Sequence, residues 1–217
     1  MKQILLGAVL LFTAALVYSQ PKTYTIVFLN HKPDAEKIDK ETQTKLFEAH
    51  MANINRLAKE GKLLAAGPFD GGGGIFILNT TSVSEAESWV ETDPAVKAKR
   101  WNLEILPYIP RVGSICPAAE PYEMVKYTLV RFNAIVDKFT ASSYPNLIRQ
   151  HDDFVKTVSK TSQVVTEAIF GDNEGGILVV MGDLPLDAFS TDPGVQQGLL
   201  DVEFKKLYIA RTSFCEN

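Results

Sequence analysis

The chain has 217 residues, of which 22 are basic and 26 are acidic, and its formal net charge is −4. A mildly acidic chain lacks the basic face that nucleic-acid phosphates demand, so we expect no nucleic-acid partner. Two cysteines are too few for a disulfide-rich scaffold or a cysteine-rich zinc site, and the histidines show no metal-binding spacing, so we expect no metal and no other cofactor.

The N-terminal segment has the layout of a secretory signal peptide. Lys2 precedes an unbroken apolar run over residues 4–17, and small or polar residues follow at Ser19 and Gln20. The alternative is a membrane anchor, but the run is shorter than the about 20 residues that span a bilayer, and no later run approaches that length. We therefore predict that residues 1–19 are removed, leaving a secreted or periplasmic protein without membrane contact.

The mature chain begins with a predicted strand and a long helix. Residues 23–29 alternate in character and are rich in β-branched and aromatic side chains, which is typical of a strand. Between residues 39 and 60, apolar side chains recur at helical spacing, and Gly61 supplies the stop. His50 lies on the apolar side of this helix, between Phe47 and Ile54.

A hairpin is predicted next. Two short apolar runs, residues 62–67 and 74–79, flank a glycine-rich segment that suits a tight turn. Backbone N–H groups of residues 70–74 could instead hold an anion. No Lys-Ser/Thr pair follows them and no helix begins after them, so the turn is the preferred interpretation.

A second helix and a last strand complete the unit. Ser82 and Glu85 form a capping-box pattern before a short helix that ends near Asp93 and Pro94. Residues 103–109 read as the final strand. The order β-α-β-β-α-β is the split unit of the ferredoxin-like α+β fold.

The rest of the chain repeats this unit. The length admits one large domain or two small ones. Segments of the first copy recur in order in the second: residues 22–30 in 125–133, 46–63 in 147–164, 73–78 in 175–180, and 103–116 in 202–215. A collinear series of this kind indicates a duplication. We predict domains at residues 22–116 and 122–215, separated by a short proline-containing connection.

The repeat also predicts how the two units are arranged. Both helices of such a unit lie on one face of its sheet, so the other face is apolar and has to be covered. Two sheets in one chain can cover each other. We therefore predict an α+β protein with two tandem ferredoxin-like domains packed as an intramolecular pseudo-dimer, either monomeric or further assembled into a homo-oligomer.

A histidine and an aspartate occur at matching positions in both copies, His50 with Asp93 and His151 with Asp192. A buried histidine needs a partner, since an unpaired polar group costs about 1–3 kcal/mol. A backbone carbonyl could serve in a purely structural role, and each Asp-Pro step could simply close a local turn. A carboxylate against one ring nitrogen would instead fix the tautomer and raise the basicity of the other, as in a general base.

Residues 49–69 and 85–98 resemble the YCII-related domain family, whose pattern has a helical His, Gly-x-Leu-x-x-Ala-Gly-Pro, a hairpin, a second helix and an Asp-Pro step. The resemblance covers nearly all of the first copy and, more loosely, the second. It implies a dimeric ferredoxin-like α+β barrel with a His–Asp pair as the active site in a pocket. By position, the pairs are His50 with Asp93 and His151 with Asp192.

The second copy departs from this pattern. It has Glu167-Ala168-Ile169-Phe170 in place of Ala-Gly-Pro-Phe, and residues 184–189 suggest a shortened second helix. These changes alter the backbone that would line the second pocket. We therefore favour the first site, and the second pair could be kept only as inherited structure.

For function, these residues predict an exported protein in which a His–Asp pair acts as a general acid/base on a small molecule, in a lyase, isomerase or hydrolase-like reaction. Two alternatives stay open. The first is a module that binds a small aromatic or acidic ligand without turnover, and the second is a structural pseudo-dimer whose histidines only stabilise the core.

Four further residues carry weaker signals. Cys116 and Cys215 end the two matching last strands, and they can form a disulfide only if they lie near the axis that relates the copies. His31 could reach the pocket, but the following Lys-Pro favours an exposed loop. Asn79 begins an Asn-Thr-Thr sequon, which matters only in a cell that glycosylates proteins.

Overall fold

The computed structural model describes residues 22–215, apart from residues 119, 139, 141–143 and 172–174. The predicted signal peptide, residues 1–19, lies outside the described residues. Among the helices that the structure describes, none is long and apolar enough to cross a membrane. We refer to residues 22–116 as the first half and to residues 122–215 as the second half.

The first half contains the predicted order of elements, with one additional short helix and one additional short strand. Its elements are β1 (Tyr24–His31), α1 (Lys40–Lys59), β2 (Leu63–Pro68), β3 (Gly74–Leu78), α2 (Val83–Val90), α3 (Pro94–Lys97), β4 (Trp101–Val112) and β5 (Ser114–Ile115). Asp39 begins α1 by accepting the backbone N–H of Thr42 at 2.8 Å, and Gly61 follows its end with a φ of 69°. Ser82 caps α2 through the N–H of Glu85, as the capping box predicts.

The second half repeats this order, but among its described residues α2 has no counterpart, whereas α5 matches α3. Its elements are β6 (Met124–Ala134), η1 (Val136–Lys138), α4 (Tyr144–Thr161), β7 (Val164–Ile169), β8 (Gly176–Met181), α5 (Pro193–Gln196), β9 (Leu200–Ala210), η2 (Arg211–Ser213) and β10 (Phe214–Cys215). The shortened helix predicted for residues 184–189 is wrong, because this segment forms turns. Pro185 lacks the backbone N–H that a helix interior needs.

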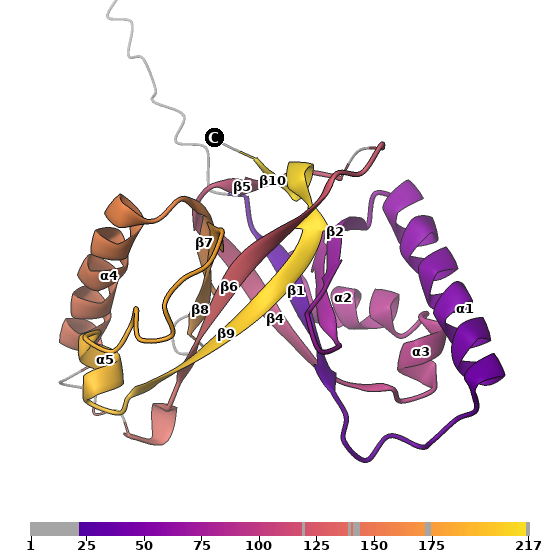
Figure 1. The fold of residues 1–217 in the computed structure, drawn as a ribbon, viewed down its shortest axis with the longest axis horizontal. Coiled ribbons are helices and arrows are strands. Elements are labelled where there is room, and N and C mark those ends of the chain that lie inside the picture. Colours follow the sequence, from indigo (N-terminus) through magenta and orange to yellow (C-terminus); the bar gives the residue numbers. More distant parts are fainter. Residues whose placement is uncertain (1–21, 119, 139, 141–143, 172–174, 216–217) are drawn as a thin grey trace, which may run out of the picture.

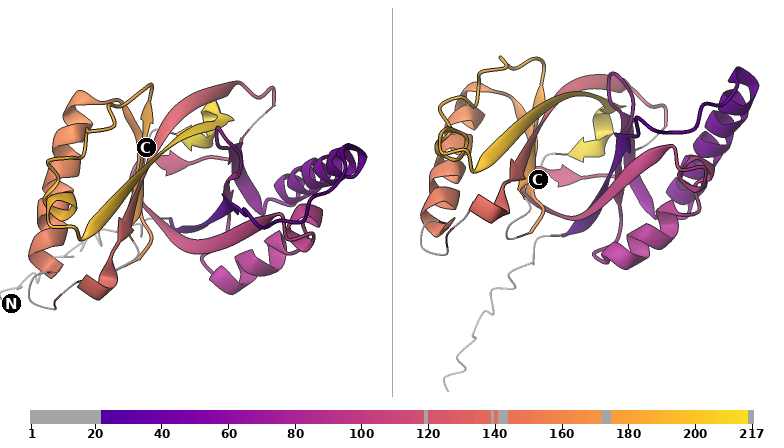
Figure 2. Two further views of the ribbon diagram at one scale, coloured as in Figure 1. Left: turned by 60° about the horizontal axis from the view of Figure 1, so that its bottom comes forward. Right: turned by 90° about the horizontal axis from the view of Figure 1, so that it is seen from below.

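Eight strands form one antiparallel sheet in the order β2-β3-β1-β4-β7-β8-β6-β9. Each half contributes four adjacent strands in the same relative order, and β4 joins the halves by pairing with β7. At the far edges β9 returns to β2, where the N–H of Asp70 donates to the carbonyl of Lys206 at 2.9 Å and Phe69 bridges Leu207. Helices α1, α2 and α3 lie on one side of the strands and α4 and α5 on the other (Figures 1 and 2).

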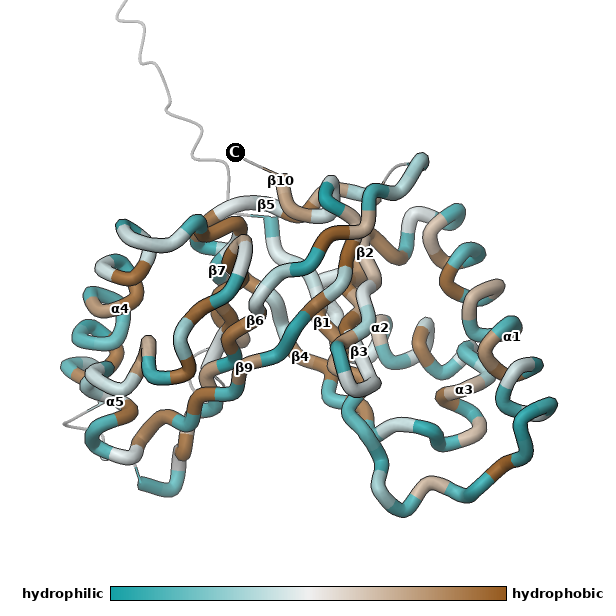
Figure 3. Tube along the Cα trace, in the orientation of Figure 1, coloured by the Kyte–Doolittle hydropathy of each residue, from teal (hydrophilic) through white to brown (hydrophobic). Residues whose placement is uncertain are grey.

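Side chains of each strand alternate between two apolar layers. On β1, Tyr24, Ile26 and Phe28 enter a core shared by both halves, whereas Val27 and Leu29 face the helices of the first half. A third cluster lies between the second-half strands and α4. Figure 3 shows hydrophobic residues along the strands and mixed hydropathy around α1 and α4, as expected of helices with one buried side.

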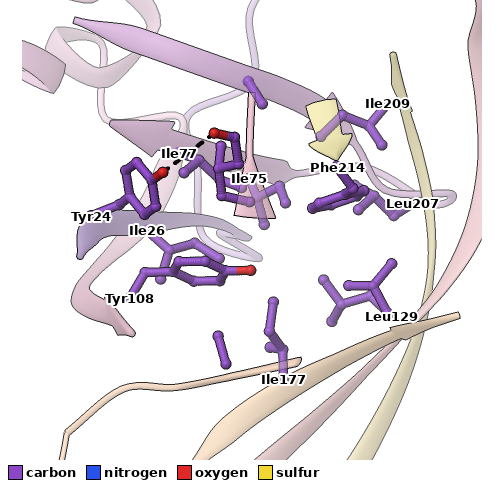
Figure 4. Close-up of a cluster of buried hydrophobic side chains, with 14 of the residues drawn as sticks. Tyr24, Ile26, Ile75, Ile77, Tyr108, Leu129, Ile177, Leu207, Ile209 and Phe214 are labelled. Atoms are coloured by element: carbon purple, nitrogen blue, oxygen red, sulfur yellow. Dashed lines mark hydrogen bonds between the residues drawn. The ribbon is translucent and has the colours of Figure 1, made fainter. Parts of the chain in front are cut away.

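The shared core draws on strands from both halves (Figure 4). Its members include Tyr24, Ile26, Ile75, Ile77, Tyr108, Leu129, Ile177, Leu207, Ile209 and Phe214. Two hydroxyls in it are satisfied, because Tyr24 donates to the carbonyl of Ile115 at 3.3 Å and the Tyr108 hydroxyl lies 2.8 Å from that of Thr166. The apolar sheet faces that needed a cover are therefore buried against each other.

The chain ends of the two halves meet at a disulfide. Cys116 and Cys215 are bonded, with their Cα atoms 5.9 Å apart. Beside them β5 and β10 pair as a small separate sheet, with Phe214 opposite Ile115. Both of these apolar residues belong to the shared core, so the small sheet covers part of it next to the covalent link.

Candidate functional site

The first predicted pair is in contact. The Nδ1 atom of His50, on α1, lies 2.8 Å from Oδ2 of Asp93, which is fully buried at the start of α3. The other oxygen, Oδ1, accepts the backbone N–H groups of Ala95 at 2.9 Å and Val96 at 3.4 Å. The local cap and the histidine partner, which we had treated as alternatives, are both present on one carboxylate.

The second pair has the same geometry. Nδ1 of His151, on α4, lies 2.6 Å from Oδ2 of Asp192. Asp192 is also fully buried, and its Oδ1 accepts the N–H of Gly194 at 2.7 Å at the start of α5. The residues predicted from the sequence are thus brought together in both halves.

The surroundings of the two histidines differ. The ring of His50 stacks on Phe76, with centroids 5.9 Å apart, and contacts Trp101 at 5.1 Å. The ring of His151 meets the edge of Phe132 at 4.7 Å. Both side chains keep a small exposed fraction, 12% for His50 and 10% for His151, so each ring is almost enclosed while retaining some access.

Polar support behind the carboxylate exists only at the first pair, among the residues described here. Asn53 donates to Oδ2 of Asp93 at 3.1 Å and accepts hydrogen bonds from Arg56 and Thr92. The matching position of the second half is Phe154, whose ring packs 5.8 Å from that of Phe189. Both carboxylates are therefore held by a histidine and by backbone N–H groups, and within the described part of the chain only the first has an additional side-chain donor, Asn53.

The protonation of Asp93 follows from these contacts. Burial alone would raise the pKa of Asp93, but the hydrogen bond and charge of His50, with the donors on Ala95 and Asn53, lower the pKa below its usual range. An ionised carboxylate only accepts hydrogen bonds, so Nδ1 of His50 carries the hydrogen. Among the described residues none hydrogen-bonds Nε2 of either histidine, so Nε2 is the ring nitrogen available to a ligand.

A cavity of about 520 Å³ adjoins the second pair. It is lined by Arg111, Phe132, Ala134, Tyr144, Ile148, His151, Asp152, Glu167, Ala168, Ile169, Gly171, Gly175, Gly176, Ile177 and Leu200. Arg111 comes from β4 of the first half, so the cavity lies across the junction of the two halves. The sequence had favoured the first site, whereas this cavity belongs to the second.

The sequence analysis missed three charged residues of this cavity, Arg111, Asp152 and Glu167. The guanidinium of Arg111 donates to Oδ1 of Asp152 from Nη1 at 2.8 Å, and to Oε1 of Glu167 from Nε at 3.0 Å and also from Nη2. Burial would lower the pKa of Arg111, but the two carboxylates together raise it. Glu167 had been noted only as a departure from Ala-Gly-Pro. No sequence signal connected it with Arg111, which is distant in the chain.

The matching positions around the first pair carry no charge. The repeat aligns Met51 with Asp152, Ala66 with Glu167, and Ala210 with Arg111. The two sites therefore share the His–Asp pair but differ in the chemistry around it.

The weaker sequence signals have structural outcomes as well. His31 ends β1 and is exposed, which agrees with the exposed position favoured over one at the pocket. Residues 70–74 connect β2 and β3, and Gly71, Gly72 and Gly73 have positive φ, so the segment is the predicted turn. Within the described residues, no cluster of three or more His, Cys, Asp or Glu side chains could hold a metal ion.

These features define an α+β protein with a large antiparallel sheet and one His–Asp pair in each half. The model of the YCII-related domain matches residues 23–109, in agreement with the resemblance drawn from the first copy. This match does not cover the second half. No curated protein matches the chain.

Solved structures agree on the fold. A chlorite dismutase variant from Candidatus Nitrospira defluvii, in complex with cyanide, is similar with a TM-score of 0.53 and 8% identity, over 87% of this chain and 92% of that one. A proposed monooxygenase from Fusobacterium nucleatum subsp. nucleatum has a TM-score of 0.50 and 11% identity, over 90% and 96%. At such identities the likeness shows the fold alone.

Proposed function

We propose that this chain is an exported enzyme that acts on a small molecule by general acid/base catalysis, within an intramolecular pseudo-dimer of two YCII-like units. The observation that carries the proposal is the repeated pair. In each half a histidine Nδ1 lies 2.6–2.8 Å from a fully buried aspartate. A purely structural histidine would be satisfied equally well by a backbone carbonyl.

The geometry suits proton transfer. The carboxylate accepts the Nδ1 hydrogen, which holds the ring in the tautomer with a lone pair on Nε2. Nε2 can then take a proton from a bound substrate, and the aspartate stabilises the resulting imidazolium. A positioned general base of this kind contributes about 10²–10⁴-fold to a rate.

We assign turnover to His151 and Asp192, because the described cavity adjoins that pair. Its volume of about 520 Å³ falls in the range typical of small-molecule sites, and its wall is largely apolar with a few polar groups. His50 and Asp93 form the second candidate pair. The alternative, a binding module without turnover, would use the same cavity.

Two further features support the remaining parts of the proposal. The same strand order in both halves and the return of β9 to β2 suit a pseudo-dimer. The Cys116–Cys215 disulfide suits an oxidising compartment, as expected after export.

The test is a turnover screen of small metabolites by NMR on the mature chain. Turnover of any substrate found is then measured for the His151→Gln and His50→Gln variants, once each is shown to be folded. Loss of about 10²-fold or more in His151→Gln alone supports the assignment. Loss in His50→Gln alone moves it to the first pair. Unchanged turnover in both variants would refute acid/base catalysis by either histidine, and ligand binding without any turnover would favour the binding module.

A further inference from the structure

The cavity beside His151 is acidic. Three carboxylates lie at it or directly behind it, on Asp152, Glu167 and Asp192, against the single guanidinium of Arg111 among the described residues that line it. The balance is negative even when His151 is protonated. In a partly enclosed site such a balance attracts cations more strongly than it would in water.

From these contacts we propose that the cavity selects a small ligand with an apolar body and a positively charged nitrogen, and that Glu167 and Asp152 determine this specificity. This inference rests on the proposed function, since it names the substrate class of the same site.

Glu167 is placed to receive such a nitrogen. Glu167 is only 9% exposed. Both hydrogen bonds that it accepts from Arg111 end on Oε1. In the part of the chain that the structure describes, Oε2 accepts no hydrogen bond. Oε2 is not among the fully buried atoms that lack a partner, and the side chain keeps 12% exposure, so a ligand can reach this oxygen. A carboxylate oxygen of this kind is a strong acceptor for a charge-assisted N–H bond.

Arg111 is correspondingly ill placed to bind an anion. Its guanidinium already donates to Glu167 from two nitrogens and to Asp152 from the third. A ligand carboxylate would have to displace one of these partners and would then lie beside the displaced negative charge. The arginine therefore positions the two carboxylates, and the cavity keeps its net negative charge.

The remaining wall supplies the contact surface for an apolar body. Its side chains include Phe132, Ile148, Ile169, Ile177 and Leu200. Removing an ammonium from water is costly unless it is paired, so apolar contacts and a carboxylate have to act together. An aromatic ring such as that of Phe132 also attracts a cation to its face.

The first half shows that the acidic group is not a requirement of the fold. Around the first pair the matching positions are Met51, Ala66 and, from the second half, Ala210, and the His–Asp contact there is kept at 2.8 Å. Charged residues at all three positions thus belong to the second-half cavity and are not needed to hold the pair together.

The experiment measures binding of benzylamine, benzyl alcohol and benzoate to the mature chain by NMR shifts of cavity amides. These probes share an apolar body and differ in charge. We expect benzylamine to bind at least about 10-fold more tightly than benzoate, a difference of about 1.4 kcal/mol. Benzoate binding as tightly as benzylamine would overturn the proposal.

Variants separate the carboxylates from the rest of the wall. Glu167→Gln should weaken benzylamine binding about 10-fold and leave benzyl alcohol binding unchanged. Asp152→Asn, on the outer side of the cavity, should act in the same direction and carries the test if Glu167→Gln does not fold. Glu48→Gln, exposed on α1, is the matched charge control. Full benzylamine affinity in the folded cavity variants would refute the specificity role.

The ligand preference and the catalytic role of His151 can be tested separately. His151→Gln should lose turnover and keep the preference for benzylamine over benzoate. Turnover that survives this variant refutes the acid/base role only, and absence of the preference refutes the ligand class only.

Discussion

At the scale of single residues, Asp93 divides its two oxygens between two roles. Oδ1 caps α3, and Oδ2 receives His50 and Asn53. The Asp-Pro step therefore serves the turn and the pair together, which explains how one short motif can be structural and functional at once.

Asp93→Asn should separate these roles. The lowered pKa of Asp93 means that the stability from its ionised form is complete above the ordinary carboxyl pKa and is lost as the pH falls through the lowered value. The variant should lose about 1–3 kcal/mol at neutral pH, and its difference from the parent should shrink in acid. Urea unfolding across a pH series measures both. Asp70→Asn, in the exposed turn between β2 and β3, is the control, and a pH-independent difference for Asp93→Asn would contradict the account.

Arg131 is a buried cation that forms an ion pair between the halves. It is 7% exposed, lies 4.2 Å above the ring of Phe28, and donates to Glu104 at 2.7 Å from Nη1 and again from Nη2. Its buried Nε has no hydrogen-bond partner among the described residues. The side chain of Glu104 is 37% exposed, so the two partners differ in their access to water.

This difference in exposure predicts that substituting either partner lowers the free energy of unfolding by different amounts. Glu104→Gln should destabilise the protein by about 3 kcal/mol or more, because it leaves a buried guanidinium unpaired. Arg131→Met should cost much less, because the remaining carboxylate can be hydrated and the methionine fills the apolar site. Chemical denaturation of the two variants gives the comparison. Equal losses would mean that Glu104 is not the partner that compensates the buried charge.

At the scale of elements, the two places where the halves meet are unlike. Strands β4 and β7 form a ladder that includes Pro110 opposite Ala168. Strands β2 and β9 approach closely at Gly67, where an added Cβ would lie 2.4 Å from the Tyr208 carbonyl oxygen and 2.9 Å from the Cβ of Ile209. The glycine of Ala-Gly-Pro is therefore needed for close approach at one junction, and the other junction accommodates alanine.

Gly67→Ala should consequently push β2 away from β9 and cost about 1–3 kcal/mol, the usual range for overpacking. Ala168→Gly, the reverse change at the matching position, should cost no more than about 1 kcal/mol through backbone entropy. Thermal and urea unfolding check both values. A harmless Gly67→Ala would show that the strands can separate without loss.

Much at this scale was predictable from the sequence, for local reasons. Strand alternation, helical spacing and the Ser82–Glu85 cap depend on near neighbours, and the repeat placed each histidine with its aspartate. The contact of Arg111 with Glu167 could not be predicted, because it depends on which edge strands of the two halves pair. The failed helix at residues 184–189 has a local cause instead, because Pro185 cannot donate a helical hydrogen bond and outweighed the copied pattern.

At the scale of the whole molecule, the Cys116–Cys215 disulfide links positions 99 residues apart at the ends of the two halves. Because a link over a long segment restricts the unfolded chain, its removal should cost about 2–4 kcal/mol. The Cys116→Ser/Cys215→Ser variant should unfold at lower urea than the oxidised parent and match the reduced parent. Intact mass without reductant checks the bond itself, and two free thiols would contradict it.

The entry of Arg111 into the neighbouring half's cavity has an evolutionary consequence. In an assembly of two identical chains, every substitution is imposed on both pockets at once. A single polypeptide that carries both pockets escapes this constraint, so one can acquire a new specificity while the other retains an ancestral wall. A C-terminal fragment expressed without the first half would therefore lack the arginine of the acidic pocket, and it should not reproduce the proposed preference for a cationic ligand.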